Sequence, residues 1–278
     1  MKVAALQMCS GYEPQANMAA LEELVAQAAG QGAQYLLSPE VTVVFAENRE
    51  QLATVAGPYE GNPHLARAGE IARQHEVYLH IGSLAVSLPD GRFANRSVLF
   101  APDGTVEAVY DKIHLFDASI AGLREYRESA TYKGGDRAVT ASVGEFTLGL
   151  AVCYDMRFPR LFNTLARMGA QVMAVPAAFT VPTGEAHWHV LLRARAIETG
   201  SYVIAAAQGG KHANGRSTYG HSLIIDPWGR VVAEIDGDQP GVVIADLDLA
   251  KVREARERVP VLANERDFAP DPGFALSR

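Results

Sequence analysis

The chain has 278 residues, of which 48% are hydrophobic and 21% are charged, and its net charge at pH 7 is −7. This acidic balance argues against a nucleic-acid backbone or an anionic membrane as the main partner, because both attract cationic surfaces. No apolar run approaches the roughly 18 residues that span a bilayer. The segment after Met1 and Lys2 lacks the apolar core of a signal peptide. With two cysteines, Cys9 and Cys153, the sequence favours a cytoplasmic protein with reduced thiols.

The first half of the chain alternates short apolar runs with amphipathic stretches, which is typical of a layered α/β protein. Strands are predicted at Lys2–Met8, Tyr35–Leu37, Val77–Val86, Ser97–Phe100 and Val106–Tyr110. Helices are predicted at Asn17–Ala29 and Pro63–His75, where apolar residues recur at helical spacing. The pattern becomes irregular from Lys112 to Asp136. A connection of that length is a candidate functional loop.

The second half continues the alternation. Strands are predicted at Val139–Val143, Phe146–Val152, Val172–Pro176, Tyr202–Ala207, Ser222–Ile225, Val231–Ile235 and Val242–Asp246. Helices are predicted to begin near Pro159 and to cover Trp188–Glu198 and Leu249–Glu257. The segment from Val259 is Pro-rich and weakly periodic. Because no linker, shift in composition or solenoid-type repeat interrupts the chain, we expect a single domain over residues 1–278.

Three reactive side chains follow directly after predicted strands: Glu40, Lys112 and Cys153. Functional groups in α/β sheets gather just beyond the carboxyl ends of strands. Glutamate and lysine at such positions are also common solvent-facing residues. The coincidence of three such residues therefore indicates a candidate site.

Cys153 has two interpretations on this pattern. Free cysteine is often a small buried hydrophobe. A cysteine between a strand and a helix is also a candidate nucleophile, since nearby backbone N–H groups and the charge of Arg157 would lower the pKa of its thiol. Cys9 lies in the first strand-like segment without such neighbours, and we interpret it as a core residue.

A nucleophile needs a base and a group that holds the oxyanion. None of the eight histidines stands at an informative position relative to a strand end. Glu40 is better placed as the base, and Lys112 would supply a fixed positive charge for the oxyanion. The loss of one oxyanion donor typically raises the barrier by about 2.7–4 kcal/mol.

Three segments in register, Leu37–Glu40, Tyr110–Asp117 and Gly149–Pro159, resemble the nitrilase superfamily of carbon–nitrogen hydrolases, and the resemblance extends over nearly the whole chain. It implies a four-layer α-β-β-α sandwich and a Glu-Lys-Cys triad. Glu40 would be the base, Lys112 the oxyanion stabiliser and proton donor, and Cys153 the nucleophile that forms a thioester.

The resemblance also implies supporting groups. Glu128 would orient Lys112 or the substrate, and the Tyr154 backbone N–H would complete the oxyanion hole. It implies no metal and no organic cofactor. Members commonly form dimers or larger homo-oligomers, and the C-terminal tail from about residue 259 would then pack at the interface.

The segment from Gly184 to Glu198 is similar to Nit-type amidases, which include deaminated glutathione amidases and ω-amidases. The implied reaction is hydrolysis of a small linear amide to a carboxylate and ammonia, with the deaminated glutathione type favoured. An ω-amidase acting on 2-oxoglutaramate, an N-carbamoyl amino acid hydrolase, a nitrilase and an inactive scaffold stay as alternatives. Candidate substrate-binding residues are Arg157, Phe179, His187 and His189, the last standing where these amidases usually carry glutamate.

Other patterns near these residues have structural interpretations. A metal site at His187 and His189 is disfavoured, because helical ligands pair at i,i+4 and no third ligand is evident. The cations Arg157, Arg193 and Arg195 would bind a substrate carboxylate or form ion pairs with Asp155 and Glu198. The glycines around Lys211 form an expected flexible loop without the spacing of a phosphate-binding motif, so no nucleotide is expected.

Overall fold

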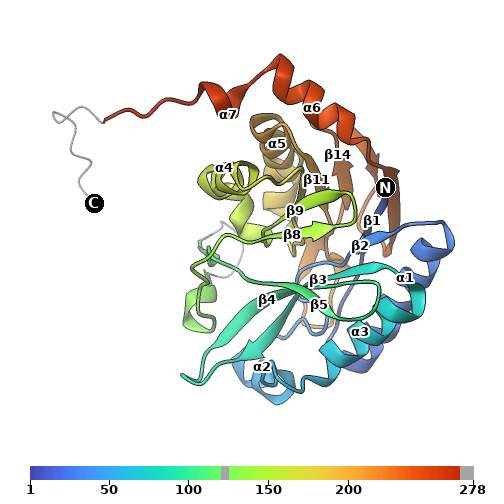
Figure 1. Cartoon of the computed structure of the whole chain (residues 1–278). Helices are drawn as coiled ribbons and strands as arrows, with labels where there is room; N and C mark the ends of the chain where they lie inside the picture. Colours follow the sequence, from blue (N-terminus) through green and yellow to red (C-terminus); the bar gives the residue numbers. More distant parts are fainter. Residues whose placement is uncertain (120–124, 270–278) are drawn as a thin grey trace.

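The computed structural model describes residues 1–119 and 125–269. Two six-stranded sheets pack together between outer helices (Figure 1). The strands of the first sheet are, in spatial order, β16 (Gly241–Asp246), β1 (Lys2–Gln7), β2 (Tyr35–Leu37), β3 (Tyr78–Ser87), β4 (Phe93–Phe100) and β5 (Val106–Asp111). Those of the second are β15 (Val231–Glu234), β14 (Leu223–Ile225), β11 (Tyr202–Ala205), β10 (Val172–Ala174), β9 (Phe146–Leu150) and β8 (Thr140–Val143). The predicted α-β-β-α sandwich is confirmed.

Helices α1 and α3 lie against the first sheet, and α4 and α5 lie against the second (Figure 1). The helices are α1 (Pro14–Gly30), α2 (Arg49–Val55), α3 (Pro63–His75), α4 (Pro159–Arg167), α5 (Val181–Thr199), α6 (Leu249–Arg258) and α7 (Val261–Asn264). Short 3₁₀ turns lie at Glu128–Ala130 and Cys153–Arg157. Two small antiparallel pairs join β6 (Asp117–Ala118) to β7 (Tyr126–Arg127) and β12 (Gly209–Lys211) to β13 (Ser217–Tyr219).

The alternation of side chains along β1 explains the layers. Val3 and Ala5 belong to the apolar cluster that contains the second sheet. Ala4 and Leu6 belong to the cluster formed with α1 and α3. Because successive strand residues point to opposite faces, β1 is buried on both sides. Such a strand reads as a continuous apolar run.

The central strands of both sheets are parallel. β1, β2 and β3 run in one direction, and so do β9, β10 and β11. Beyond these strands, isolated parallel β-bridges join Met8 to Gln208 and Ala177 to Ala207. The carboxyl ends of both sheets therefore meet at one edge, which is where strand-end side chains can converge.

Several predicted boundaries differ from the structure. Helix α5 begins at Val181 rather than Trp188, since Pro182 occupies its first turn, where proline is tolerated. β4 begins at Phe93 rather than Ser97. The glycine-rich segment expected as a loop forms the β12–β13 pair. Cys9 was wrongly assigned to the core: it is exposed, because β1 ends at Gln7 and Cys9 no longer follows its alternation.

The C-terminal segment after Val259 forms α7, and Arg167 donates a 2.9 Å hydrogen bond to the carbonyl of Leu262. Phe268 is 91% exposed, and residues 270–278 lie outside the described residues. The role of this tail at an oligomer interface stays a prediction. Within residues 1–119 and 125–269, no helix combines the length and apolar character needed to cross a membrane.

Candidate active site

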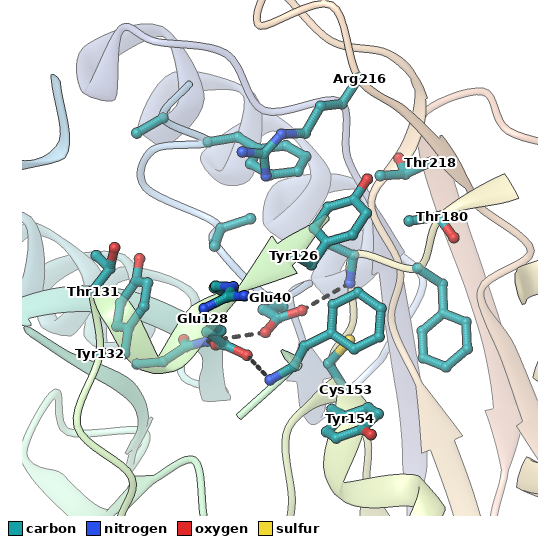
Figure 2. Close-up of a pocket in the computed structure, with 18 of the residues that line it drawn as sticks. Glu40, Tyr126, Glu128, Thr131, Tyr132, Cys153, Tyr154, Thr180, Arg216 and Thr218 are labelled. Carbon is teal, nitrogen blue, oxygen red and sulfur yellow. Dashed lines mark hydrogen bonds between the residues drawn. The ribbon is translucent and has the colours of Figure 1, made fainter. Parts of the chain in front are cut away.

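The ends of β2, β5 and β9 bring Glu40, Lys112 and Cys153 together. Figure 2 shows the side chains of Glu40 and Cys153 near each other in the cavity. The Lys112 Nζ donates to Glu40 Oε1 at 2.9 Å and to Glu128 Oε1 and Oε2 at 3.0 and 2.8 Å. Its side chain is only 2% exposed. An ammonium ion this deeply buried needs charge partners, and the two carboxylates supply them.

Both carboxylates are held by further donors. Asn95 Nδ2 bonds Glu40 Oε1 at 2.9 Å and Glu128 Oε1 at 3.1 Å, so one amide links the two acids. The backbone N–H of Ala178 donates to Glu40 Oε2 at 3.0 Å, and that of Phe116 donates to Glu128 Oε2 at 2.6 Å. These bonds fix the carboxylates in place before any substrate binds.

The protonation states follow from burial and charge. Burial raises the pKa of the Cys153 thiol well above its usual value, and the charge of Glu40 and a hydrogen bond with it raise this pKa further, against the opposing charge of Lys112. Burial lowers the pKa of Lys112, but the charges of Glu128 and Glu40 outweigh it and leave the pKa well above the ordinary value. The resting site therefore holds a neutral thiol beside a charged ammonium. The predicted lowering of the thiol pKa was wrong, because the sequence does not show how completely Cys153 is buried.

The backbone at Cys153 adopts a left-handed conformation with φ of 48°, which costs a non-glycine residue about 1–2 kcal/mol. The Cys153 N–H donates to the carbonyl of Pro176 at 2.8 Å. Two residues later, buried Asp155 accepts from the Val152 N–H at 2.9 Å and from the Tyr110 hydroxyl at 2.7 Å. It also lies 2.7 Å from His114 Nδ1. Asp155 thus fixes the turn that presents the thiol.

A cavity of about 340 Å³ opens onto Cys153. Aromatic side chains form much of its wall: Phe45, Phe116, Tyr126, Tyr132, Tyr154 and Phe179. Figure 2 shows Arg216 and Thr218 on the side away from Cys153 and Glu128. No acceptor bonds the Tyr154 backbone N–H in the part of the chain that the structure describes. That donor is free to hold an oxygen beside the thiol.

A family model described as carbon–nitrogen hydrolase matches residues 2–257. The chain belongs to this family. As a carbon–nitrogen hydrolase of the nitrilase superfamily it is a hydrolase that acts on amides, in agreement with the sequence resemblance.

Individual relatives of this carbon–nitrogen hydrolase also support its assignment to the family. A deaminated glutathione amidase from Yersinia enterocolitica is 38% identical over 268 residues, covering 95% of this chain and 92% of that protein. Saccharomyces cerevisiae Nit3, a member of branch 10 of the nitrilase superfamily, has a TM-score of 0.85 at 28% identity and covers 94% of each chain. An amidase from Nesterenkonia sp. AN1 has a TM-score of 0.80 at 27% identity, covering 96% of this chain and 94% of that one. That structure is of a glutamate-to-glutamine mutant of the amidase, with the acetamide moiety of fluoroacetamide covalently added at the active-site cysteine.

The remaining predicted residues of the carbon–nitrogen hydrolase divide into two groups. Arg157 and Phe179 line the cavity, with the Arg157 guanidinium 5.3 Å from the centre of the Phe179 ring. His187 is exposed and lies 3.3 Å from Arg157, outside the cavity wall. His189 lies 2.7 Å from Glu234, and neither residue lines the cavity. In the ranges that the structure describes, His189 therefore does not line the cavity in which a substrate would bind.

The two other arginines have structural partners. Arg195 is buried, pairs with Glu198 and donates to the carbonyl of Met156 at 2.7 Å. Arg193 donates to the carbonyl of Gly229 at 2.7 Å. Only Arg157 of the three reaches the cavity. The ion pair proposed between an arginine and Asp155 was wrong, because Asp155 is fully buried among Val152, Tyr110 and His114.

Sequence reasoning missed Asn95 and the structural role of Asp155. Asn95 carried no clear signal, because it precedes the predicted strand at Ser97–Phe100 and stands beside the polar residues Arg96 and Ser97. Asp155 stood in the recognised segment beside Cys153, but its partners Tyr110 and His114 are distant in sequence. Only the three-dimensional structure brings them together.

Proposed function

We propose that the chain is an amidase of the deaminated glutathione type, with Cys153 as the nucleophile. The observation that carries the proposal is the convergence of a neutral buried thiol, the Glu40 carboxylate and the Lys112 ammonium at the end of one cavity. Relatives named deaminated glutathione amidase match most of the chain and support the choice of substrate class.

In the first step, Glu40 takes the proton of Cys153 as the sulfur attacks the amide carbon. The carbonyl electron pair moves onto oxygen, where Lys112 and the Tyr154 N–H hold the negative charge. Collapse of this intermediate breaks the carbon–nitrogen bond, and the proton passes from Glu40 to the departing amine. The enzyme is left as a Cys153 thioester.

In the second step, Glu40 removes a proton from water, which attacks the thioester carbon. The same donors hold the second oxyanion, and its collapse releases the carboxylic acid. Cys153 regains a proton and the resting thiol returns. Glu128 and Asn95 are positioning residues here, because they hold Lys112 and Glu40 without reaching the reacting carbon.

The substrate class changes one detail of the sequence prediction. Deaminated glutathione carries its amide between a 2-oxo acid and a cysteinylglycine dipeptide, so cleavage releases the dipeptide amine and not ammonia. Both parts of this substrate end in a carboxylate. Of the arginines that line the cavity, we assign Arg157, in the same 3₁₀ turn as Cys153, and Arg216 to these carboxylates. Arg216 lies on the side away from Cys153. The Arg216 Nε is buried and bonds no group in the described ranges.

The test compares deaminated glutathione, 2-oxoglutaramate, N-carbamoyl-β-alanine and a simple nitrile, with the carboxylic acid product measured by mass spectrometry. We expect the highest kcat/KM for deaminated glutathione, by about tenfold or more, and none with Cys153→Ser. Arg216→Ala should raise KM for deaminated glutathione but not for 2-oxoglutaramate, which lacks the dipeptide. Arg193→Ala is the matched control.

Preference for 2-oxoglutaramate or the N-carbamoyl compound would retain the triad and replace the substrate assignment. Retained turnover in Cys153→Ser would refute the assignment of the nucleophile. Failure to hydrolyse any of the four compounds would refute the assignment of deaminated glutathione as the substrate. Self-association and a cytoplasmic location stay predictions.

A further inference from the structure

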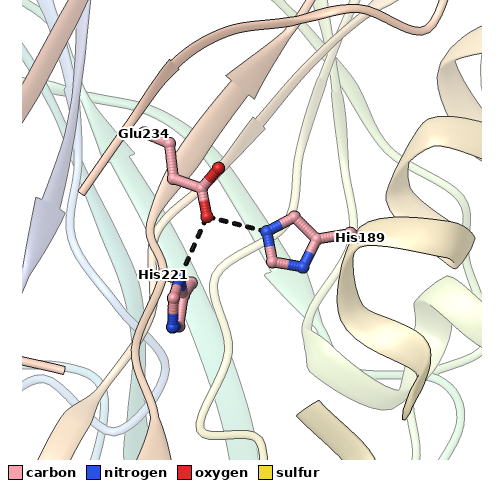
Figure 3. A group of neighbouring side chains, drawn as sticks. All are labelled: His189, His221 and Glu234. Carbon is pink, nitrogen blue, oxygen red and sulfur yellow. Dashed lines mark hydrogen bonds and ion pairs between the residues drawn. The ribbon is translucent and has the colours of Figure 1, made fainter. Parts of the chain in front are cut away.

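A second cluster of reactive side chains lies outside the catalytic cavity. His189, His221 and Glu234 converge on one point (Figure 3). His189 Nε2 lies 2.7 Å from Glu234 Oε1, and His221 Nδ1 lies 3.0 Å from the same oxygen. Among the described residues this is the one group of three or more histidine, cysteine or acidic residues that could hold a metal ion.

Three separate elements place these side chains. His189 lies on α5, His221 lies just before β14, and Glu234 ends β15. The His221 backbone has a φ of 55° and is held on both sides: its N–H donates to the carbonyl of Gly237 at 2.9 Å, and its carbonyl accepts from Trp188 Nε1 at 2.8 Å. The cluster is therefore built on fixed backbone and not on a loose surface loop.

The hydrogen bonding within the cluster is unusual. Two imidazole nitrogens face a single carboxylate oxygen, so each must carry a proton there in order to donate. A cation between the three groups would take the lone pairs of both nitrogens and the charge of Glu234. Each neutral imidazole would then carry its proton on the other ring nitrogen.

The donor set and spacing fit a particular class of ion. Two imidazoles and a carboxylate suit Zn²⁺ and its transition-metal neighbours better than Mg²⁺ or Ca²⁺, which prefer oxygen. Ligand atoms about 2.0–2.1 Å from a tetrahedral zinc ion lie roughly 3.4 Å from one another. The three ligand atoms here all lie within 4.8 Å of one another, so small side-chain movements would close the site.

The side chains are also accessible to an ion from solution. They are 32%, 21% and 28% exposed for His189, His221 and Glu234. Partial exposure leaves room for water on the open side of the ion. The net charge of the site with neutral imidazoles is negative, which favours a cation.

We propose that His189, His221 and Glu234 bind one divalent transition-metal ion, with Zn²⁺ as the probe. The site is separate from catalysis, because none of its residues lines the cavity. Sequence reasoning predicted no metal, since it paired His189 with His187 and had no means of placing His221 or Glu234 beside it. The ion would tie α5 to the end of the second sheet.

Two aromatic contacts connect the proposed metal site to the cavity wall. Trp188 packs on Phe179 with ring centres 5.1 Å apart, and Tyr219 stacks on His221 at 4.3 Å. Thr218, next to Tyr219, also lines the cavity. The ion would therefore stiffen one side of the substrate pocket.

The experiment titrates chelator-treated full-length protein with ZnCl₂ by calorimetry near pH 7.5. A Cys9→Ser, Cys153→Ser background removes binding by thiols. We expect one ion per chain and a rise in Tm with zinc. His189→Ala and Glu234→Gln should each weaken binding at least about tenfold, a loss comparable to that seen for outer groups of metal sites. His187→Ala, an exposed neighbour outside the cluster, should bind zinc as the parent does.

Circular dichroism without metal shows whether each variant is folded. Absence of binding in the thiol-free background up to about 1 mM zinc would overturn the proposal. Equal affinity in the His189→Ala and parent proteins would also overturn it. The amidase assay reports on a different site, so its outcome leaves this test unaffected.

Discussion

At the scale of single residues, the neutral thiol of Cys153 determines how the chemistry must begin. Burial and the charge of Glu40 both oppose the thiolate. An enzyme that stored a thiolate would need a cation pair with the sulfur, but here Lys112 is held by two carboxylates. In the proposed mechanism the proton therefore leaves Cys153 as the substrate arrives, and Glu40 is the adjacent carboxylate that would take it.

Glu40→Gln should separate thiol acidity from catalysis. Removing the negative charge lowers the pKa of Cys153, so the pH profile for alkylation by iodoacetamide should move to lower pH. Amide hydrolysis should nevertheless fall by about 100-fold or more, because no general base remains. A Cys9→Ser background confines labelling to Cys153. An unchanged alkylation profile would show that Glu40 does not control the thiol.

The sequence predicted which proposed catalytic side chains lie together better than it predicted their supports. Glu40, Lys112 and Cys153 could be grouped because each follows an apolar strand, and the family resemblance supplied Glu128. Asn95 and Asp155 act through partners from other strands and turns. Their significance depends on packing, which residue order does not encode locally.

At the scale of elements, the approach of the two sheets fixes the distance between the catalytic strands. Gly82 on β3 lies where the two sheets approach each other. A Cβ atom there would meet the carbonyl oxygens of Ser38 and Pro39 at 2.1 and 2.4 Å, and Pro176 at 2.5 Å. Pro39 directly precedes Glu40, and the Pro176 carbonyl accepts from the Cys153 N–H. A side chain at Gly82 would push Glu40 and Cys153 apart.

Gly82→Ala should therefore destabilise the fold by about 1–3 kcal/mol or more and lower kcat through misplacement of Glu40. Urea denaturation and the amidase assay measure the two effects. Gly30→Ala is the matched control, because Gly30 ends α1 and no atom lies within 4 Å of its added Cβ. If Gly82→Ala keeps the wild-type stability and kcat, the strands that precede Glu40 and Cys153 can move apart without loss of stability or activity, and the argument is wrong.

Prediction of the elements succeeded where periodicity was strong and failed where context decides. The apolar spacing of α3 and the run in β1 predicted both correctly. The start of α5 was missed because residues 183–187 have little apolar periodicity and the helix there depends on its packing. The β12–β13 pair was missed because glycines suggest flexibility, while here they permit close approach: a Cβ on Gly209 would lie 2.2 Å from the carbonyl of Asp238.

At the scale of the whole molecule, the two sheets share a strand plan. Each has three parallel central strands flanked by antiparallel neighbours. The interior between the two sheets includes polar groups as well as apolar ones. His80 on β3 is fully buried, 2.8 Å from the Tyr35 hydroxyl and 2.7 Å from the Ser97 hydroxyl. Burial lowers the pKa of His80 from 6.5 to about 3.

This burial predicts a specific loss of stability in acid. Between about pH 6.5 and pH 3 the unfolded chain binds a proton at His80 that the native protein does not, so the free energy of unfolding decreases as the pH falls. The titration of His80 causes no loss of stability above pH 6.5, and at pH 5 it lowers the free energy of unfolding by about 2 kcal/mol. The His80→Gln variant has no imidazole at this position and therefore lacks this pH-dependent loss. Urea unfolding of both proteins at about pH 7 and pH 5 should show the stability gap narrowing in acid, and a constant gap would contradict the argument.

The protonated state of Cys153 also bears on oxidative damage. Peroxides react with thiolates far faster than with neutral thiols, and the first product is a sulfenic acid. A nucleophile that stays protonated until substrate occupies the cavity is vulnerable only during turnover, when bound substrate itself blocks access to the sulfur. We therefore expect the same burial that makes the thiol dependent on Glu40 to slow oxidation of the idle enzyme by peroxide.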